Sequence, residues 1–203
     1  MRRVRTAVLI SGTGSNMEAL IRASADPAYP AAVELVISNV PNAAGLSKAR
    51  ALGVEAIAID HKDFATRAAF EAVVDTALRE RGVELVALAG FMRVLTPDFV
   101  EGWTQRMVNI HPSLLPRHKG LHTHRRALDA GDSEHGASVH WVTPELDSGA
   151  MISQARLKVT PAHTEASLRA DVQRLEHALY PEALAQAAAV VAEGKLSPRS
   201  RRR

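Results

Sequence analysis

The chain has 203 residues, of which 46% are hydrophobic and 23% charged, a globular composition that excludes a disordered chain. It has no cysteine, which excludes a disulfide framework and thiolate chemistry. The formal charge of +3 depends on a basic tail, because Arg199, Arg201, Arg202 and Arg203 supply four positive charges. The rest is about neutral and only 4% of residues are aromatic, which argues against an RNA-binding domain.

Neither end of the chain shows a targeting or membrane segment. The apolar run Ala7–Ile10 is too short for the core of a signal peptide. No stretch approaches the roughly 20 apolar residues of a membrane-spanning helix. The sequence therefore predicts a cytoplasmic protein.

Strands and helices alternate through the first half of the chain. Short apolar, β-branched runs predict strands at Val4–Ile10, Val33–Ser38, Glu55–Ile59 and Glu84–Ala89. Helix-forming segments lie between them at Ser15–Ile21, Ala43–Leu52 and Phe64–Arg81. This alternation predicts an α/β fold with a mostly parallel sheet and helices on both of its faces.

The second half predicts an antiparallel extension. A strand at Met107–Ile110 leads into a proline-rich loop, and the alternating segment Ala137–Val142 is expected to pair with Met151–Val159. A last helix is expected at about Glu165–Val191. We therefore expect a single domain over residues 1–195, followed by the basic tail at 196–203.

A glycine-rich turn, Ser11–Asn16, follows the first strand and opens the first helix. Free backbone N–H groups and the partial positive charge of a helix start suit a phosphate. A dinucleotide site fits less well, because Met17 replaces the third glycine of the fingerprint and no acidic residue ends the second strand. A phosphomonoester is therefore favoured, with a plain glycine turn as the alternative.

Five polar side chains of the second half suit acyl-transfer chemistry. Asn109 and His111 are two residues apart, so both face the same side of a strand. An amide can stabilise an oxyanion and an imidazole can move a proton. Ser138 and His140 share one face of their own strand, and Asp147 lies in a loop where it either meets a histidine or only forms the turn.

A cluster of histidines raises the question of a metal site. Six lie within thirty residues: His111, His118, His122, His124, His135 and His140. Neither an H-E-x-x-H motif nor a cysteine pair accompanies them, so no metal is expected.

Four segments occur together in a fixed order, and as a set they are far more specific than any one alone. They are Ser11–Asn16, Leu88–Arg93, Asn109–Pro116 and Gly136–Gly149. The set resembles the folate-dependent glycinamide ribonucleotide transformylases of purine synthesis, from about residue 4 to 195. The resemblance implies a Rossmann-like formyltransferase fold and transfer of a formyl group from 10-formyltetrahydrofolate to the amine of glycinamide ribonucleotide. It implies small-molecule partners, with no nucleic acid, membrane or metal.

The resemblance also implies a role for each matching residue. Asn109 would polarise the formyl oxygen, His111 would shuttle the proton, and Asp147 would keep His111 protonated and help to place a water. Support would come from Ser138 and His140. The nucleotide would contact Gly12, Thr13, Gly14, Ser15, Asn16, Arg67 and Glu176. The folate would lie between Met92, Arg93, Val94 and Leu95 on one side and Thr143, Pro144, Glu145 and Leu146 on the other. Residues 1–100 would thus form the nucleotide half, and residues 101–195 the catalytic and folate-binding half.

Relatives with the same chemistry are the alternatives. Methionyl-tRNA formyltransferase adds a C-terminal domain and formyltetrahydrofolate deformylase an N-terminal one, and strands and helices from residue 4 to about 191 leave room for neither. A nucleotide-binding module without catalysis gives no reason for Asn109, His111 and Asp147 to occur together. The segment Arg117–Lys119 departs from the family pattern, so the contacts of its loop stay open.

Overall fold

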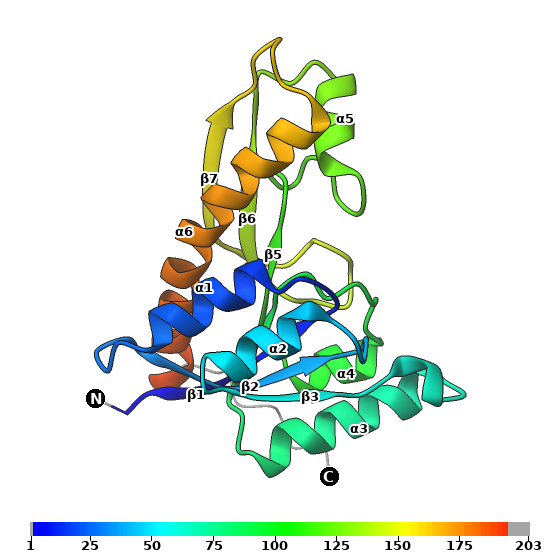
Figure 1. The fold of residues 1–203 in the computed structure, drawn as a ribbon, viewed down its shortest axis with the longest axis vertical. Coiled ribbons are helices and arrows are strands. Elements are labelled where there is room, and N and C mark those ends of the chain that lie inside the picture. Colours follow the sequence, from blue (N-terminus) through cyan, green and yellow to red (C-terminus); the bar gives the residue numbers. More distant parts are fainter. Residues whose placement is uncertain (1, 195–203) are drawn as a thin grey trace.

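The computed structural model describes residues 2–194, which form a seven-stranded sheet with helices packed against it (Figure 1). The strands are β1 (Val4–Ile10), β2 (Ala31–Ser38), β3 (Glu55–Ala58), β4 (Leu85–Leu88), β5 (Met107–His111), β6 (Glu134–Trp141) and β7 (Met151–Lys158). Their order is β3-β2-β1-β4-β5-β6-β7. The first five are parallel, whereas β6 is antiparallel to both β5 and β7. The predicted parallel sheet and its antiparallel extension are confirmed.

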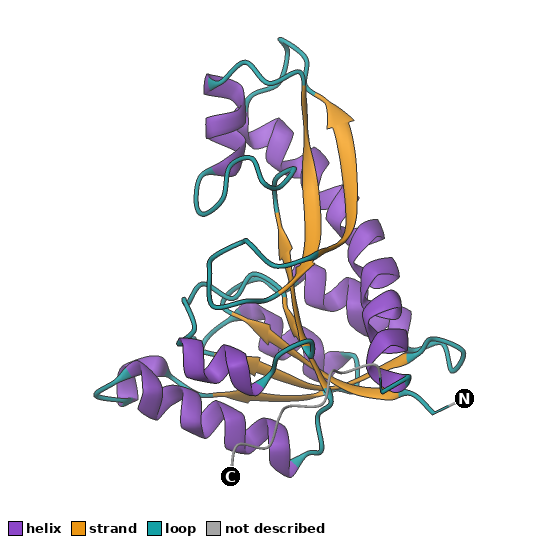
Figure 2. Cartoon of the chain, turned by 180° about the vertical axis from the view of Figure 1, so that it is seen from behind, coloured by secondary structure: helices purple, strands orange, loops and turns teal. Residues whose placement is uncertain are grey.

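Helices cover both faces of the sheet (Figure 2). They are α1 (Ser15–Ser24), α2 (Ala44–Ala51), α3 (Arg67–Glu80), α4 (Pro97–Gly102), α5 (Thr123–Asp129) and α6 (Glu165–Ala192), with a 3-10 turn η1 at His61–Asp63. Alternate residues of β1 enter two separate cores: Val8 packs with α1, α2 and α6, and Leu9 packs with α3 and α4. A strand buried on both faces needs a continuous apolar sequence, as β1 has.

Two helices were not predicted, and the start of α3 differs from the prediction by three residues. The structure adds α4 and α5, which no periodic pattern marks because each is shorter than eight residues. Helix α3 starts at Arg67 rather than Phe64, because the Thr66 hydroxyl accepts the Ala69 N–H at 3.1 Å and caps the helix there.

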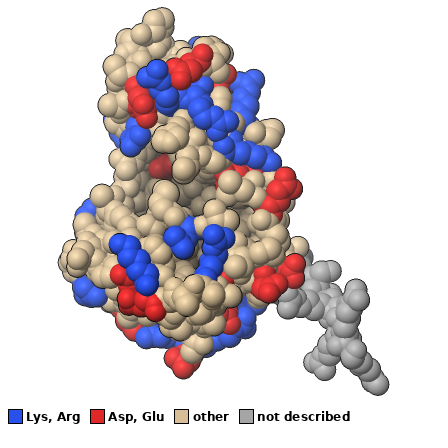
Figure 3. All heavy atoms as spheres, turned by 90° about the vertical axis from the view of Figure 1, so that its right-hand side faces the viewer, with Lys and Arg blue, Asp and Glu red and all other residues tan. Residues whose placement is uncertain are grey.

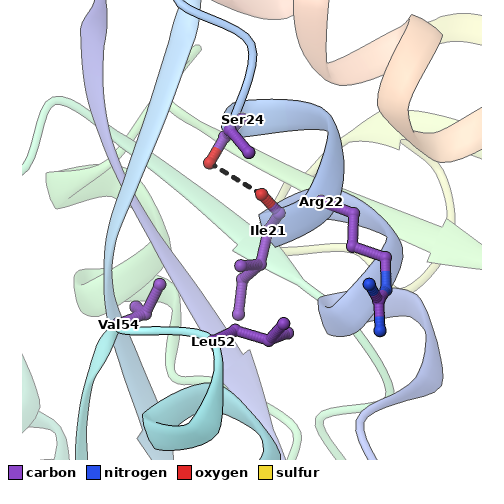
Figure 4. Close-up of a pocket in the computed structure, with 6 residues that line it drawn as sticks. Ile21, Arg22, Ser24, Leu52 and Val54 are labelled. Atoms are coloured by element: carbon purple, nitrogen blue, oxygen red, sulfur yellow. Dashed lines mark hydrogen bonds between the residues drawn. The ribbon is translucent and has the colours of Figure 1, made fainter.

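The described helices include none with the length and hydropathy needed to cross a membrane. The predicted basic tail at 196–203 lies outside the described residues. The end of α1 and the turn between α2 and β3 enclose a shallow, mostly apolar hollow lined by Ile21, Leu52 and Val54 among others (Figure 4). It lies at the opposite end of α1 from the glycine-rich turn, and none of the expected site residues lines it.

Candidate active site

Three segments expected to carry the site leave the sheet at one edge. Leu9 of β1 lies beside Leu88 of β4, which in turn lies beside Asn109 of β5. The glycine-rich turn after β1, the segment after β4 and the loop after β5 therefore emerge together at the carboxyl ends of parallel strands, where open α/β sheets bind ligands.

Four of the polar side chains lie on one face of the β5–β6 pair. The antiparallel register places Asn109 opposite His140 and His111 opposite Ser138. Directly opposite residues of antiparallel strands point to the same side. Ile110 and Val139, one position along, enter the core with α6 on the other side. The structure thus brings these four residues together.

His111 is buried and lies between two oxygen atoms. Its Nε2 is 3.0 Å from the carbonyl oxygen of His118, and its Nδ1 is 3.4 Å from Oδ2 of Asp147. Burial is the strongest influence on the His111 pKa and lowers it below its usual value; the His118 carbonyl and the Asp147 charge oppose that effect. The Asp147 charge therefore favours the protonated ring but is outweighed by burial, and the role of keeping His111 protonated stays a prediction.

Asp147 is held in an unusual backbone conformation, with φ at +49°. Its Oδ2 accepts the Gly120 N–H at 2.9 Å, and its Oδ1 lies 3.6 Å from His140 Nε2. Burial alone would raise the Asp147 pKa, but the His140 ring, the Gly120 N–H and the charge of His111 together lower it. Asp147 is therefore ionised at neutral pH and faces two histidine rings.

The turn Ser11–Asn16 leaves the start of α1 open. Gly14 caps the helix in a left-handed conformation, φ +70°, and supplies no side chain to the first N–H groups. Asn16 Nδ2 donates to Glu176 Oε2 of α6 at 2.9 Å, and Asn16 Oδ1 is buried without a hydrogen-bond partner in the described chain. Burial raises the pKa of Glu176. This pair joins the two halves of the chain beside a free helix N-terminus, an arrangement suited to a phosphorylated, hydroxyl-bearing ligand.

The model of the formyl transferase family matches residues 4–184. The chain belongs to this family.

Relatives of known name agree with this membership. The chain is 45% identical over 174 residues to the phosphoribosylglycinamide formyltransferase of Escherichia coli, covering 86% of the chain and 82% of that protein. It is 49% identical over 186 residues to the trifunctional purine biosynthetic protein adenosine-3 of Drosophila melanogaster. It spans only 14% to 18% of the length of that protein and of the other trifunctional relatives it matches first.

Solved structures agree with the fold. The phosphoribosylglycinamide formyltransferase of Brucella melitensis superposes with a TM-score of 0.89 at 45% identity, covering 93% of this chain and 97% of that one. Glycinamide ribonucleotide transformylase 1 of Symbiobacterium toebii superposes with a TM-score of 0.90 at 39% identity, covering 98% of this chain and 92% of that one.

The two residues expected to support the site, His140 and Ser138, make different contacts. His140 Nδ1 lies 2.9 Å from the Trp141 carbonyl oxygen, and its Nε2 lies 3.3 Å from the Asn109 amide nitrogen and 3.6 Å from Asp147 Oδ1. Among the described residues, the Asn109 amide nitrogen has no other hydrogen-bond partner. Ser138 instead donates to the Ser113 carbonyl at 2.6 Å and accepts from the Leu115 N–H, which fixes the loop after β5.

The expected folate segments carry exposed apolar side chains. Met92, Val94 and Leu146 are all more than half exposed. The segment after β4 is anchored at both ends: the Met92 N–H donates to Ser11 Oγ at 2.7 Å, and the Thr96 N–H donates to the buried Glu71 at 2.8 Å. Figure 3 shows this side of the molecule hollowed between two parts, with an acidic side chain inside the hollow.

The remaining expected residues are placed as follows. Arg67 is exposed and begins α3, whereas the other nucleotide residues belong to the turn, α1 and α6. His124 and His135 contact each other at 3.1 Å, and burial lowers the pKa of each to about 4. Within residues 2–194 no three histidine, aspartate or glutamate side chains are grouped as metal ligands.

Sequence reasoning missed several residues that hold the site. Gln154 Nε2 donates to the Leu115 carbonyl oxygen and to Ser138 Oγ, and Glu71 accepts from Thr96. Neither residue could be identified from the sequence, because a polar residue in a helix or strand is ordinarily solvent-exposed. Ser11 was part of the glycine-rich motif, but nothing in the sequence indicated that its hydroxyl reaches Met92 and also Asn39, 2.5 Å away.

Gly149 controls how the Asp147 loop returns to the sheet. A Cβ at this position would lie 1.7 Å from the Trp141 carbonyl oxygen, so the backbone has to move. We expect Gly149→Ala to lower the free energy of unfolding by about 1 to 3 kcal/mol, as overpacking does. Chemical denaturation measures this free energy. Gly102→Ala is the control, since a Cβ at Gly102 would make only an ordinary van der Waals contact. Equal stability of the two variants would contradict this reading of the loop.

Proposed function

We propose that this chain transfers the formyl group of 10-formyltetrahydrofolate to the amine of glycinamide ribonucleotide. The observation that carries the proposal is the grouping of Asn109, His111 and Asp147 at the sheet edge from which the phosphate turn also emerges. The similarity to phosphoribosylglycinamide formyltransferases supports it. The folate is a co-substrate in this proposal and is consumed in each turnover.

The geometry supports a role for each side chain. The amine nitrogen attacks the formyl carbon, and the carbonyl oxygen becomes an oxyanion that the free N–H of Asn109 stabilises. A proton leaves the attacking nitrogen and reaches N10 of the folate through His111. The bond between the formyl carbon and N10 then breaks, giving formylglycinamide ribonucleotide and tetrahydrofolate. The Asp147 carboxylate stabilises His111 while it holds the proton.

We further propose that the nucleotide phosphate binds at Gly12–Asn16, with Glu176 and Asn16 meeting the ribose or amine end. Asn16 Oδ1 is buried without a partner among the described residues, and Glu176 Oε2 accepts from Asn16 Nδ2, so this pair offers oxygen atoms that can accept a hydrogen bond from a ribose hydroxyl. The folate would lie against Met92–Leu95 and Thr143–Leu146, whose exposed apolar side chains suit a flat aromatic ring.

A substrate comparison tests the proposal. Purified protein is given 10-formyltetrahydrofolate with glycinamide ribonucleotide, with methionyl-tRNA, or with water alone, and tetrahydrofolate release is followed. We expect release only with the nucleotide. Release with water alone would indicate a deformylase, and formylation of the tRNA would indicate a transferase for a larger substrate.

The phosphate turn gives a separate prediction. In Gly14→Val the new Cβ would lie 2.9 Å from the Gly45 backbone, and a β-branched residue strongly disfavours the left-handed conformation. We expect the KM for the nucleotide to rise by at least about tenfold while the KM for the folate changes much less. Steady-state kinetics with each substrate varied in turn measures both. An equal rise in the two values would place the phosphate elsewhere.

A further inference from the structure

A short backbone segment, His118–Gly120, contacts both His111 and Asp147. The His118 carbonyl oxygen lies 3.0 Å from His111 Nε2, and the Gly120 N–H donates to Asp147 Oδ2 at 2.9 Å. A carbonyl only accepts hydrogen bonds, so the first contact needs a proton on Nε2, and Nδ1 is the nitrogen that faces the Asp147 carboxylate. The segment therefore determines which nitrogen of His111 can exchange a proton beside the carboxylate.

The same segment is fastened by contacts outside the site. The His118 ring donates from Nε2 to Oδ2 of Asp132 at 2.6 Å, and the Arg126 guanidinium donates to the Lys119 carbonyl at 2.6 Å. The Lys119 ammonium donates to the Ser148 hydroxyl. His118 has φ at +53°, a conformation that residues with a Cβ avoid unless contacts hold them in it.

Asp132 is the anchor that holds the His118 ring. It sits between α5 and β6, and its two carboxylate oxygens face His118 and Arg117, at 2.6 Å and 3.7 Å. Both partners belong to the segment 117–119, so one carboxylate holds two neighbouring residues of the loop after β5.

We propose that Asp132 is a positioning residue for formyl transfer: by holding the His118 ring it fixes the position of the His118 carbonyl oxygen, which accepts the hydrogen bond from His111 Nε2. This inference rests on the proposed role of His111. It predicts that loss of the Asp132 carboxylate changes the tautomer of His111 without any change at the reacting atoms.

The test uses Asp132→Ala in the full chain, with Asp129→Ala as the matched control. Asp129 ends α5 three residues earlier, is exposed and pairs only with Arg125 among the described contacts. Nitrogen-15 NMR of His111, at a pH where its ring is neutral, reports the tautomer without substrate. We expect the Nε2–H form in the wild type and in Asp129→Ala, and a mixture of tautomers in Asp132→Ala.

Kinetics gives the second readout. We expect kcat of Asp132→Ala to fall by about 10-fold to 100-fold, as displaced catalytic groups do, while both KM values stay within about twofold. If Asp132→Ala matches the control in tautomer and in kcat, the inference is wrong. His118→Asn provides a second variant, since asparagine tolerates a positive φ but is too short to keep the Asp132 contact; it should reproduce both effects, and a wild-type result there would equally overturn the inference.

The two readouts separate this inference from the proposed function. A wild-type protein without formyl transfer would overturn the function, yet the tautomer change would still be measurable. A functional enzyme with an unchanged tautomer in both variants would overturn only the role of Asp132.

Discussion

Replacing Asp147 with asparagine is expected to lower kcat by about 10² to 10⁴, the range of general acid–base catalysis. The substitution keeps the size of the side chain but removes the charge that lies 3.4 Å from His111 Nδ1. Burial already lowers the His111 pKa, and Asp147 is one of the two groups that oppose it. Without the carboxylate the pKa falls further, so less imidazolium is present to protonate the leaving nitrogen.

An NMR titration of His111 in the wild type and in Asp147→Asn measures the electrostatic part of this effect. We expect a lower midpoint in the variant. The pH dependence of the free energy of unfolding checks the direction of the Asp147 pKa shift. The Asp147 pKa is lowered in the folded protein, so its ionised form adds stability that is present above the unfolded pKa, about 3.9, and is lost as pH falls through the folded pKa. Coincident titration curves would show that the Asp147 charge does not affect the His111 pKa and that Asp147 only shapes its loop.

Asn109→Ala is expected to lower kcat by about 10² to 10³, the loss seen when an oxyanion donor is removed. One N–H of the Asn109 amide is used by His140 and the other is available to the developing oxyanion. The variant removes both, while the β5–β6 backbone pairing stays intact. Single-turnover kinetics with saturating substrates isolates the chemical step.

Asn42→Ala is the control for this variant, since Asn42 is exposed in the turn before α2. The control should retain wild-type kcat. A loss smaller than about tenfold in Asn109→Ala would assign the oxyanion to another donor, with His111 as the first candidate.

The sequence predicted the sheet and the direction of its polar side chains, because both depend on local patterns. β-branched runs marked the strands, and a spacing of two placed Asn109 with His111 and Ser138 with His140. Helix α5 was missed because its cap is His122 in a left-handed conformation, without a side-chain hydrogen bond that a motif would reveal.

The contacts of the 118–120 segment could not be predicted from the sequence, for a different reason. They are made by a backbone carbonyl and a backbone N–H. Almost every residue has both groups, so the residue type does not indicate where such contacts form. For Ser138, the sequence predicted the position of the side chain but not its hydrogen bonds. Its face was predicted correctly, but its hydroxyl holds the loop at Ser113 and Leu115.

The pairing of Asn16 with Glu176 bears on how the protein acquires activity during synthesis. The two residues are separated by 160 positions, and Glu176 lies on the last helix of the described chain. A nascent chain that has already formed β1 to β4 would still lack Glu176, and with it one side of the proposed nucleotide site, because domains are completed as translation proceeds from the N-terminus. Ribosome-bound intermediates should therefore not capture the nucleotide until α6 has emerged, so substrate binding reports completion of the fold.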